Sequence, residues 1–207
     1  MSCITNNIFI IDWWWFWLEG KILFLCGKGG TGKDSVLNML LKAYPTMFTR
    51  YVLTTTRDMR YGEIEGVEYH FCDTETFLDR DNKGEFIIVE KYSIANGNIN
   101  FYGVGDIPID DTVYVLCGTN TQFYKLKEIY GDRVVGVYLY NTSYTSLTRM
   151  LSRLRDRTEY NVLESCRRVL SDSYDYMYID FQSFDLTINT DDYCLSEEIE
   201  LIHKLFE

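Results

Sequence analysis

A glycine-rich stretch carries the residue types best suited to binding phosphate, and it reads Gly27-Lys28-Gly29-Gly30-Thr31-Gly32-Lys33-Asp34-Ser35. An apolar run at 22–26 predicts a buried strand before it, and the pattern at 36–43, closed by Pro45, predicts a helix after it. The glycines let backbone N–H groups converge on an anion, and the helix N-terminus adds partial positive charge. We therefore interpret the stretch as a P-loop whose Lys33 reaches the β- and γ-phosphates of a nucleotide. The alternative, a glycine-rich turn without a ligand, is disfavoured by the flanking strand and helix.

The position after the lysine departs from the usual P-loop pattern, in which a Ser or Thr hydroxyl meets Mg²⁺. Here that residue is Asp34, and Ser35 follows it. A carboxylate is also a hard oxygen ligand for such an ion. Asp34, directly or through water, and Ser35, one place later, are therefore both candidate ligands, and Mg²⁺ is the expected cofactor.

A second set of anion-binding side chains follows a short predicted strand that runs into a polar loop at 51–57. Arg57 and Arg60 lie three residues apart, a glycine turn follows, and Tyr69 comes next. Guanidinium groups match phosphate oxygens in pairs, and a tyrosine hydroxyl is a further donor. The loop is therefore a candidate anion clamp, although its composition alone favours a solvated loop.

Length and composition narrow the classes of protein. The chain has 207 residues, 46% of them hydrophobic, which suits one α/β domain with a small insertion or lid. The net charge of −11 disfavours a nucleic-acid groove or an anionic membrane as partner. Its six cysteines show no paired or metal-type spacing, so we expect reduced thiols in a cytoplasmic protein. The chain has only two histidines, which disfavours a histidine-based metal site or a Ser-His triad. A cluster of arginines lies late in the chain: Arg149, Arg153, Arg155, Arg157, Arg167 and Arg168.

Strands and helices alternate along the chain, which predicts a parallel sheet with helices on both faces. A capped short helix is expected at 73–78 and strands at 84–92, 100–103, 112–117, 133–139 and, more weakly, 186–188. The last predicted helix spans 196–206, with Ser196 as its N-cap. Residues 1–19 form an atypical extension whose apolar run, 8–18, is too short to span a membrane and lacks a signal-peptide pattern. We expect this extension to pack on the domain or to form a homodimer contact, unless it lies outside the functional domain.

One segment closely resembles the substrate-binding signature of the guanylate kinase family, T-T-R-x-x-R-x-G-E-x-x-G-x-x-Y-x-F. The chain matches it at every fixed position, with Thr55-Thr56-Arg57, Arg60, Gly62-Glu63, Gly66 and Tyr69-His70-Phe71. The resemblance covers roughly residues 20–205. It implies a P-loop NTPase fold over 20–207, with a nucleoside-monophosphate-binding subdomain at about 53–104 and an arginine-rich lid at about 150–168.

The resemblance also implies roles for individual residues. ATP is expected on the P-loop, and the monophosphate acceptor, GMP in the first instance, on Arg57, Arg60, Glu63, Tyr69, Glu90 and Tyr102. The implied catalytic residues are Lys33, Arg157, Arg168 and Arg153, the last lying one helical turn before Arg157. The family's glycine is missing from Arg157-Thr158-Glu159, and a basic surface helix pairing with Glu159 and Glu164 is the alternative to a lid.

The departures from the family cluster at the positions that read the guanine base, which are Leu53, Ile88, Val104 and Cys117 here. Phosphate contacts are kept while base contacts change, which predicts relaxed or altered specificity. Glu90, on the same strand face as Ile88, and Thr54 are candidates to replace them. A guanylate kinase-like phosphotransferase is the main hypothesis. The alternatives are a same-fold kinase for another (deoxy)nucleoside monophosphate and a non-catalytic binding module of the same fold.

Overall fold

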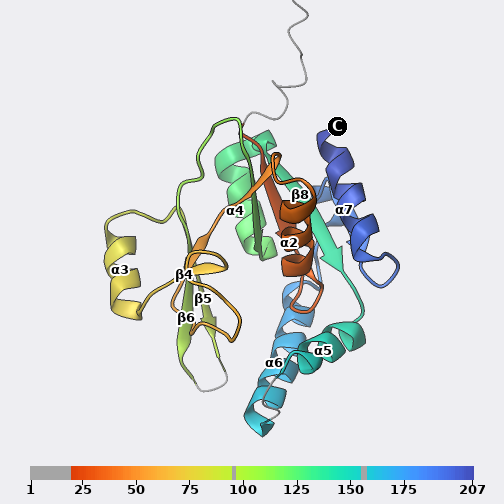
Figure 1. Ribbon diagram of the computed structural model, residues 1–207. Coiled ribbons are helices and arrows are strands. Elements are labelled where there is room, and N and C mark those ends of the chain that lie inside the picture. Colours follow the sequence, from red (N-terminus) through yellow and green to blue (C-terminus); the bar gives the residue numbers. More distant parts are fainter. Residues whose placement is uncertain (1–19, 95–96, 155–157) are drawn as a thin grey trace, which may run out of the picture.

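A five-stranded parallel sheet forms the centre of the molecule. The computed structural model describes residues 20–94, 97–154 and 158–207 (Figure 1). The strand order is β2 (Phe48–Arg50), β7 (Val113–Gly118), β1 (Ile22–Cys26), β8 (Val134–Tyr140) and β9 (Leu186–Asn189). All four strand pairs are parallel, and β1 is buried along its whole length. The predicted α/β fold with a parallel sheet is confirmed.

Helices cover both faces of this sheet. The side chains of Leu23 and Leu25 lie in one core cluster with residues of α2 (Lys33–Ala43) and α7 (Leu195–His203). The alternate residues of β1 face the opposite cluster, where Phe24 packs on Phe123 of α4 (Asn120–Tyr130) with ring centroids 5.9 Å apart. Because every residue of β1 is buried on one face or the other, the strand reads as a continuous apolar run.

A second sheet lies to one side of the parallel sheet (Figure 1). Its order is β4 (Tyr69–Phe71), β3 (Leu53–Thr55), β6 (Ile99–Val104) and β5 (Ile88–Ser93). The strands β3 and β4 are parallel, whereas β6 runs antiparallel to both of its neighbours. The sheet is built from residues within the range 53–104, which is the range predicted for the small subdomain.

The helix α3 (Thr74–Asn82) packs on this second sheet. Asp73 caps it, accepting a hydrogen bond from the Thr76 N–H at 2.7 Å, as the sequence predicted. The buried Phe77 ring stacks on Phe86 with centroids 4.6 Å apart and packs against Phe101. The subdomain therefore has an aromatic core of its own.

The arginine-rich segment forms a pair of helices, α5 (Ser143–Ser152) and α6 (Glu159–Asp175), at the bottom of the view in Figure 1. Thr142 and Thr158 cap their N-termini by accepting hydrogen bonds from Thr145 and Asn161 N–H groups. Short 3₁₀ turns complete the described elements: η1 (Gly131–Arg133), η2 (Phe181–Ser183) and η3 (Lys204–Phe206). Within the described ranges, no helix has the length and apolar character needed to cross a membrane.

Two expectations about element boundaries are wrong, and one strand was not predicted. The short strand expected within 51–57 is present as β3, but β2 precedes it and the two strands join different sheets. The strand predicted from residue 84 begins only at Ile88. Ser196 does not cap the last helix, because α7 begins one residue earlier with Cys194 as N-cap. The Glu197 carboxylate reaches back to accept the Cys194 N–H at 2.8 Å, and this capping box fixes the start of the helix.

Candidate active site

The P-loop connects the end of β1 to the start of α2. Its backbone passes through φ +84° at Gly30 and φ +100° at Gly32, a region that side-chain-bearing residues rarely adopt. A Cβ atom on Gly30 would lie 2.7 Å from the carbonyl oxygen of Ser146, at the start of α5. The glycine therefore lets the helix pair α5–α6 approach the loop closely.

The side chain of Lys33 folds back over the loop. Its Nζ donates hydrogen bonds to the carbonyl oxygens of Gly27 at 2.6 Å and Lys28 at 2.8 Å. The buried Thr31 hydroxyl donates to the same Lys28 carbonyl at 2.9 Å. These contacts hold the ammonium group against the loop, so a mobile positive charge lies beside the loop backbone.

Arg149 of α5 contacts both the P-loop and Thr190. No role of its own was predicted for this residue from the sequence. Its Nη1 donates to Thr190 Oγ1 and its Nη2 to the Thr190 carbonyl, each at 3.0 Å. Nη1 also lies 3.4 Å from the carbonyl oxygens of Gly30 and Thr31. Its membership of the arginine cluster was the only signal available, because the partner Thr190 is 41 residues away.

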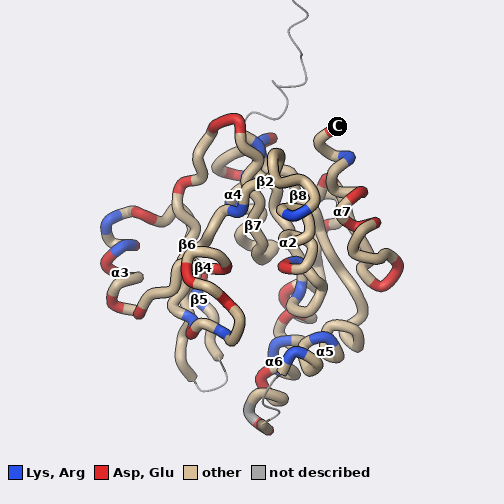
Figure 2. Tube along the Cα trace, in the orientation of Figure 1, with Lys and Arg blue, Asp and Glu red and all other residues tan. Residues whose placement is uncertain are grey.

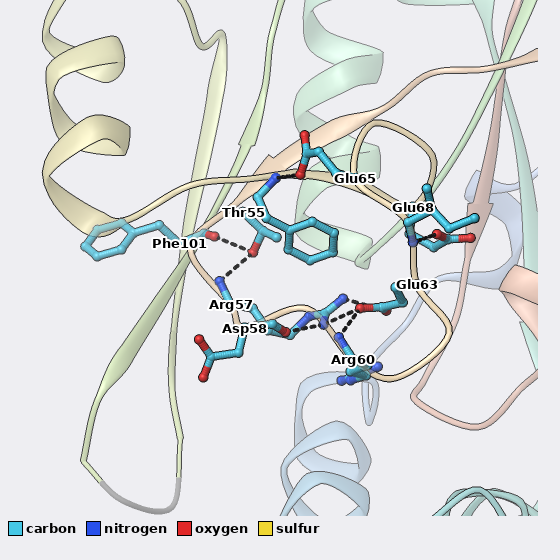
Figure 3. A network of polar contacts seen from close by, with 10 residues as sticks. Thr55, Arg57, Asp58, Arg60, Glu63, Glu65, Glu68 and Phe101 are labelled. Carbon is cyan, nitrogen blue, oxygen red and sulfur yellow. Dashed lines mark hydrogen bonds and ion pairs between the residues drawn. The ribbon is translucent and has the colours of Figure 1, made fainter.

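The loop after β3 is organised by a two-point ion pair (Figure 3). Arg57 Nη1 and Nη2 each donate to a carboxylate oxygen of Glu63 at 2.8 Å. Burial lowers the pKa of Arg57, but the hydrogen bonds to Glu63, together with the nearby charges of Glu63 and of the Tyr102 and Tyr69 hydroxyl groups, leave the pKa raised. The guanidinium also lies over the rings of Tyr69 and Phe71, 5.1 and 5.4 Å from their centroids. Glu63 therefore orients Arg57 rather than standing alone as a ligand.

Arg60 follows Arg57 on the same loop. Its backbone N–H donates to Glu63 at 2.6 Å. Desolvation lowers the pKa of the Arg60 side chain, and the positive charges of Arg57 and of Arg168 on α6 lower it further. The Arg60 residue is exposed, and an anion bound beside it would offset the repulsion from the Arg57 and Arg168 charges.

Tyr69 links the same loop to the P-loop helix. Burial raises the pKa of Tyr69, and the neighbouring Tyr102 and the Asp34 carboxylate raise it further. The Tyr69 and Tyr102 rings meet edge to face, with centroids 5.9 Å apart. Tyr69 also packs on the core cluster that contains Cys26, the last residue of β1, so the arginine–tyrosine loop lies near the P-loop.

Glu90 is a buried carboxylate on the strand next to Tyr102, its direct cross-strand partner. It accepts a hydrogen bond from the Tyr92 hydroxyl at 2.6 Å and from the Thr119 hydroxyl at 3.1 Å. Burial and the bond to Glu90 raise the pKa of Tyr92, so this phenol stays protonated and donates. Thr54, the other candidate for base recognition, accepts a hydrogen bond from Arg80 at 3.2 Å.

The arginines predicted to form a lid differ in how exposed they are and in what they contact. Figure 2 shows Lys and Arg gathered where α5 and α6 lie next to each other. Arg168 is half-buried on α6, and Arg153 is exposed at the C-terminal end of α5. Arg167 instead pairs with Glu164 of its own helix at 2.7 Å, as the surface-helix alternative expected of that segment. Arg157 lies outside the described residues, so its place stays a prediction.

A family model described as guanylate kinase matches residues 19–204 of the chain. The chain belongs to the guanylate kinase family. The guanylate kinase of Helicobacter hepaticus is 31% identical over 144 residues, which are 67% of this chain and 69% of that protein. That of Chlorobaculum tepidum is 31% identical over 155 residues, covering 71% of this chain and 74% of the relative. The match to the Aliivibrio fischeri protein, at 35% identity, spans 44% of that relative's length.

A solved structure of the guanylate kinase from Anaplasma phagocytophilum has the same fold. It superposes with a TM-score of 0.66 and 24% sequence identity, covering 91% of this chain and 85% of that chain. The predicted family and fold class are therefore confirmed. So is the predicted enzyme class, an ATP-dependent nucleoside monophosphate kinase.

The positions where this guanylate kinase family member departs from the base-reading pattern are part of its core. Leu53, Ile88 and Val104 are all buried in one hydrophobic cluster. Cys117 is packed against the other cluster, and desolvation raises the pKa of its thiol. These side chains make apolar contacts in place of the polar groups that a base would need.

The candidate metal ligands lie at the start of α2. Asp34 is exposed and Ser35 is half-buried. A search of the described part of the chain finds no group of three or more His, Cys, Asp and Glu side chains arranged to hold a metal ion. The homodimer contact predicted for 1–19 falls outside the described residues and stays a prediction.

Proposed function

We propose that this chain transfers the γ-phosphate of ATP to the phosphate of GMP, giving ADP and GDP. The observation that carries the proposal is the convergence of two anion-binding sets. Tyr69 of the acceptor loop packs on the core cluster that includes Cys26, directly before the P-loop. The charge of Asp34 also raises the pKa of Tyr69, and the charge of Arg168 on α6 lowers that of Arg60. Phosphoryl transfer asks a protein mainly for such positioning and for neutralisation of charge.

The donor side binds ATP through backbone and one lysine. The N–H groups of the loop 27–35 receive the phosphate oxygens, and the N-terminus of α2 adds its partial positive charge. Lys33 exchanges its carbonyl partners at Gly27 and Lys28 for phosphate oxygens. The rest of the loop keeps its shape because Arg149 and Thr31 hold it.

The acceptor side holds the monophosphate through side chains. Arg57, Arg60, Tyr69 and Tyr102 supply the donors, and Glu63 keeps the Arg57 fork in one orientation. An acceptor phosphate oxygen attacks the γ-phosphorus of ATP, and the bond to the β-phosphate oxygen breaks. The acceptor is already an anion, so the step needs no general base.

The helix pair completes the site. Arg168, together with Arg157 and Arg153 of the same arginine-rich segment, neutralises charge on the group being transferred. When the pair closes over the nucleotides it also excludes the water that would hydrolyse ATP.

The ion fits the chemistry of the donors present. Asp34 is an exposed carboxylate directly after Lys33, and Ser35 offers a hydroxyl beside it. Both are hard oxygen ligands, and Mg²⁺ usually shares its shell between one or two such side chains and substrate phosphates. A bound Mg²⁺ would supply charge neutralisation at the terminal phosphates.

Glu90 is the residue that we assign to the guanine base. It stands on the same face of the second sheet as Tyr102, beside the acceptor phosphate site. Its carboxylate has lone pairs beyond those used by Tyr92 and Thr119, and guanine presents N1–H and N2–H donors. One observation favours the alternative function, a kinase of the same fold that acts on another (deoxy)nucleoside monophosphate. This observation is the apolar packing of Leu53, Ile88 and Val104.

A coupled assay of ADP release over GMP, AMP, CMP, UMP and dTMP tests the proposal, with Lys33→Ala as the inactive control. The proposal expects the highest kcat/KM with GMP, and Glu90→Gln should lower that value while sparing the KM for ATP. Turnover with another monophosphate but not GMP would instead favour the same-fold kinase. Absence of turnover with every acceptor would contradict the proposal and favour a binding module.

We infer a cytoplasmic setting for the reaction. The support comes from the described cysteines, which carry free thiols: Cys26, Cys72, Cys117, Cys166 and Cys194. Free thiols are typical of a reducing compartment. Fractionation of cells that express the tagged chain tests this directly.

A further inference from the structure

A carboxylate from α6 is bonded to the P-loop. The N–H of Gly29 donates to Asp172 Oδ2 at 2.5 Å, across 143 residues of sequence. Asp172 is half-buried and lies one helical turn after Arg168. Glycine-rich loops of this kind aim their N–H groups at an anion. Here the anion at Gly29 is supplied by the chain itself.

Three side chains from α5 and α6 lie close to Gly29. A Cβ atom on Gly29 would lie 3.1 Å from Asp172 Oδ2, 3.6 Å from Arg168 Nη2 and 3.6 Å from Met150 Sδ. The carboxylate and the guanidinium therefore lie together over the loop, and Met150 of α5 closes one side. A phosphate oxygen bound to the Gly29 N–H would meet the Arg168 cation favourably and the Asp172 carboxylate unfavourably.

A second contact fixes α6 to the same loop. The hydroxyl of Tyr176, the C-cap of α6, donates to the Gly27 carbonyl at 3.2 Å. Tyr176 is buried and stacks on Tyr138, with ring centroids 6.0 Å apart. The C-terminal part of α6 is thus held by packing, and Asp172 reaches the loop from a firmly placed helix.

We propose that the Asp172 carboxylate competes with the phosphates of ATP for the N–H of Gly29. This proposal rests on the proposed role of the P-loop as the ATP site. The carboxylate and a phosphate oxygen accept the same hydrogen bond from Gly29, so the nucleotide must displace Asp172 in order to bind. Asp172 therefore lowers the affinity of the donor site, whereas Arg168, one turn earlier, remains beside the incoming phosphate.

The consequence is selective for ligands that carry a phosphate chain. ADP, ATP and inorganic tripolyphosphate place oxygens on the loop and compete with Asp172. Adenosine has no phosphate and does not compete. The residue thus sets how strongly the phosphate chain, rather than the nucleoside, contributes to donor binding.

Calorimetric titration of ADP and of tripolyphosphate into the whole chain tests this inference. Asp172→Ala should lower both Kd values by about tenfold, the scale of a hydrogen bond to a charged group, and Asp172→Asn by less. The matched control is Asp175→Asn, which removes the same charge from an exposed position on the same helix. The control should change either Kd by less than about twofold, since exposed charges are screened.

The outcomes separate this inference from the proposed function. If the unaltered chain binds ADP and both Asp172 variants bind it equally or more weakly, Asp172 is no competitor and the inference is overturned. If the unaltered chain binds neither ADP nor tripolyphosphate, the donor site itself is misassigned. Should Asp172→Ala not fold, as judged by its thermal unfolding, the isosteric Asp172→Asn decides.

Discussion

Two glycines with the same backbone angle show how differently the two anion sites are built. Gly30 in the P-loop and Gly62 in the acceptor loop both have φ +84°. A Cβ on Gly30 would lie 2.7 Å from the backbone of Ser146, whereas around Gly62 nothing lies within 4 Å. At Gly30 the P-loop is therefore packed against the backbone of α5, whereas the acceptor loop is open around Gly62.

The contacts that hold each site follow the same division. The P-loop follows β1, whose residues from Leu23 to Cys26 are fully buried. The acceptor loop instead depends on side chains, above all the Arg57–Glu63 pair and the aromatic rings beneath it. A site made of side chains can change its specificity when those side chains are substituted. This agrees with the sequence, which departs from the family pattern at the base-reading positions but keeps the P-loop glycines.

The largest effect is expected at the donor site. Lys33→Ala removes the mobile cation while the loop's N–H groups remain, so kcat with ATP and GMP should fall at least about 100-fold. The thermal unfolding midpoint should stay close to that of the unaltered chain. Retention of most of the activity would mean that the phosphate chain of ATP lies elsewhere.

The glycine pair provides a matched test of stability. Gly62→Ala should lower the free energy of unfolding by about 1–2 kcal/mol, the strain of a positive φ alone. Gly30→Ala adds a clash with the Ser146 backbone and should lower it by about 2–5 kcal/mol in total. Chemical denaturation of both variants measures the difference. Equal losses would show that the P-loop is no more tightly packed than the acceptor loop.

At the acceptor site the expected effect is on binding. Arg57→Ala removes a two-pronged donor, so the KM for GMP should rise about 10- to 100-fold with little change in the KM for ATP. Steady-state kinetics with each substrate varied in turn gives both constants. A rise in the KM for ATP alone would reverse the assignment of the two sites.

The smallest effect is on the pH dependence of stability. Burial raises the pKa of Glu63, but hydrogen bonds from Arg57 and from the Arg60 N–H outweigh it and leave the pKa below its ordinary value. A lowered folded-state pKa means that the stabilisation is complete above the unfolded pKa of about 4.3 and is lost as the pH falls through the folded value. Unfolding midpoints of the unaltered chain and Glu63→Gln should therefore differ at pH 7 and converge under acid conditions. A difference that persists at the lowest pH would point to packing instead.

The backbone of the proposed donor site was easier to predict from the sequence than that of the proposed acceptor site. The glycines, Lys33 and the flanking strand and helix are local in the chain, and backbone conformation follows from local residue types. Arg149 and Asp172 could not be placed in this way. Each contacts the loop across more than a hundred residues, and only the packing of α5 and α6 brings them there.

Local patterns also misjudged some boundaries. The predicted cap at Ser196 has the right residue type, but Glu197 pairs with the N–H of Cys194 and moves the helix start. Near Tyr51, the sequence predicted one short strand and gave no sign that the chain changes sheets between β2 and β3. Glu90 was named from its strand face, whereas its hydroxyl partner on Thr119 depends on the contact between α4 and β5.

The central claim is that the P-loop and the arginine–tyrosine loop lie close enough for a phosphoryl group to pass directly between nucleotides bound to them. Adenosine and guanosine joined through a chain of five phosphates should therefore occupy both sites at once. By calorimetry we expect this compound to bind at least about 100-fold more tightly than ADP or GMP alone. Lys33→Ala and Arg57→Ala should each weaken its binding. Binding no tighter than that of ADP, or insensitivity to either substitution, would contradict the account.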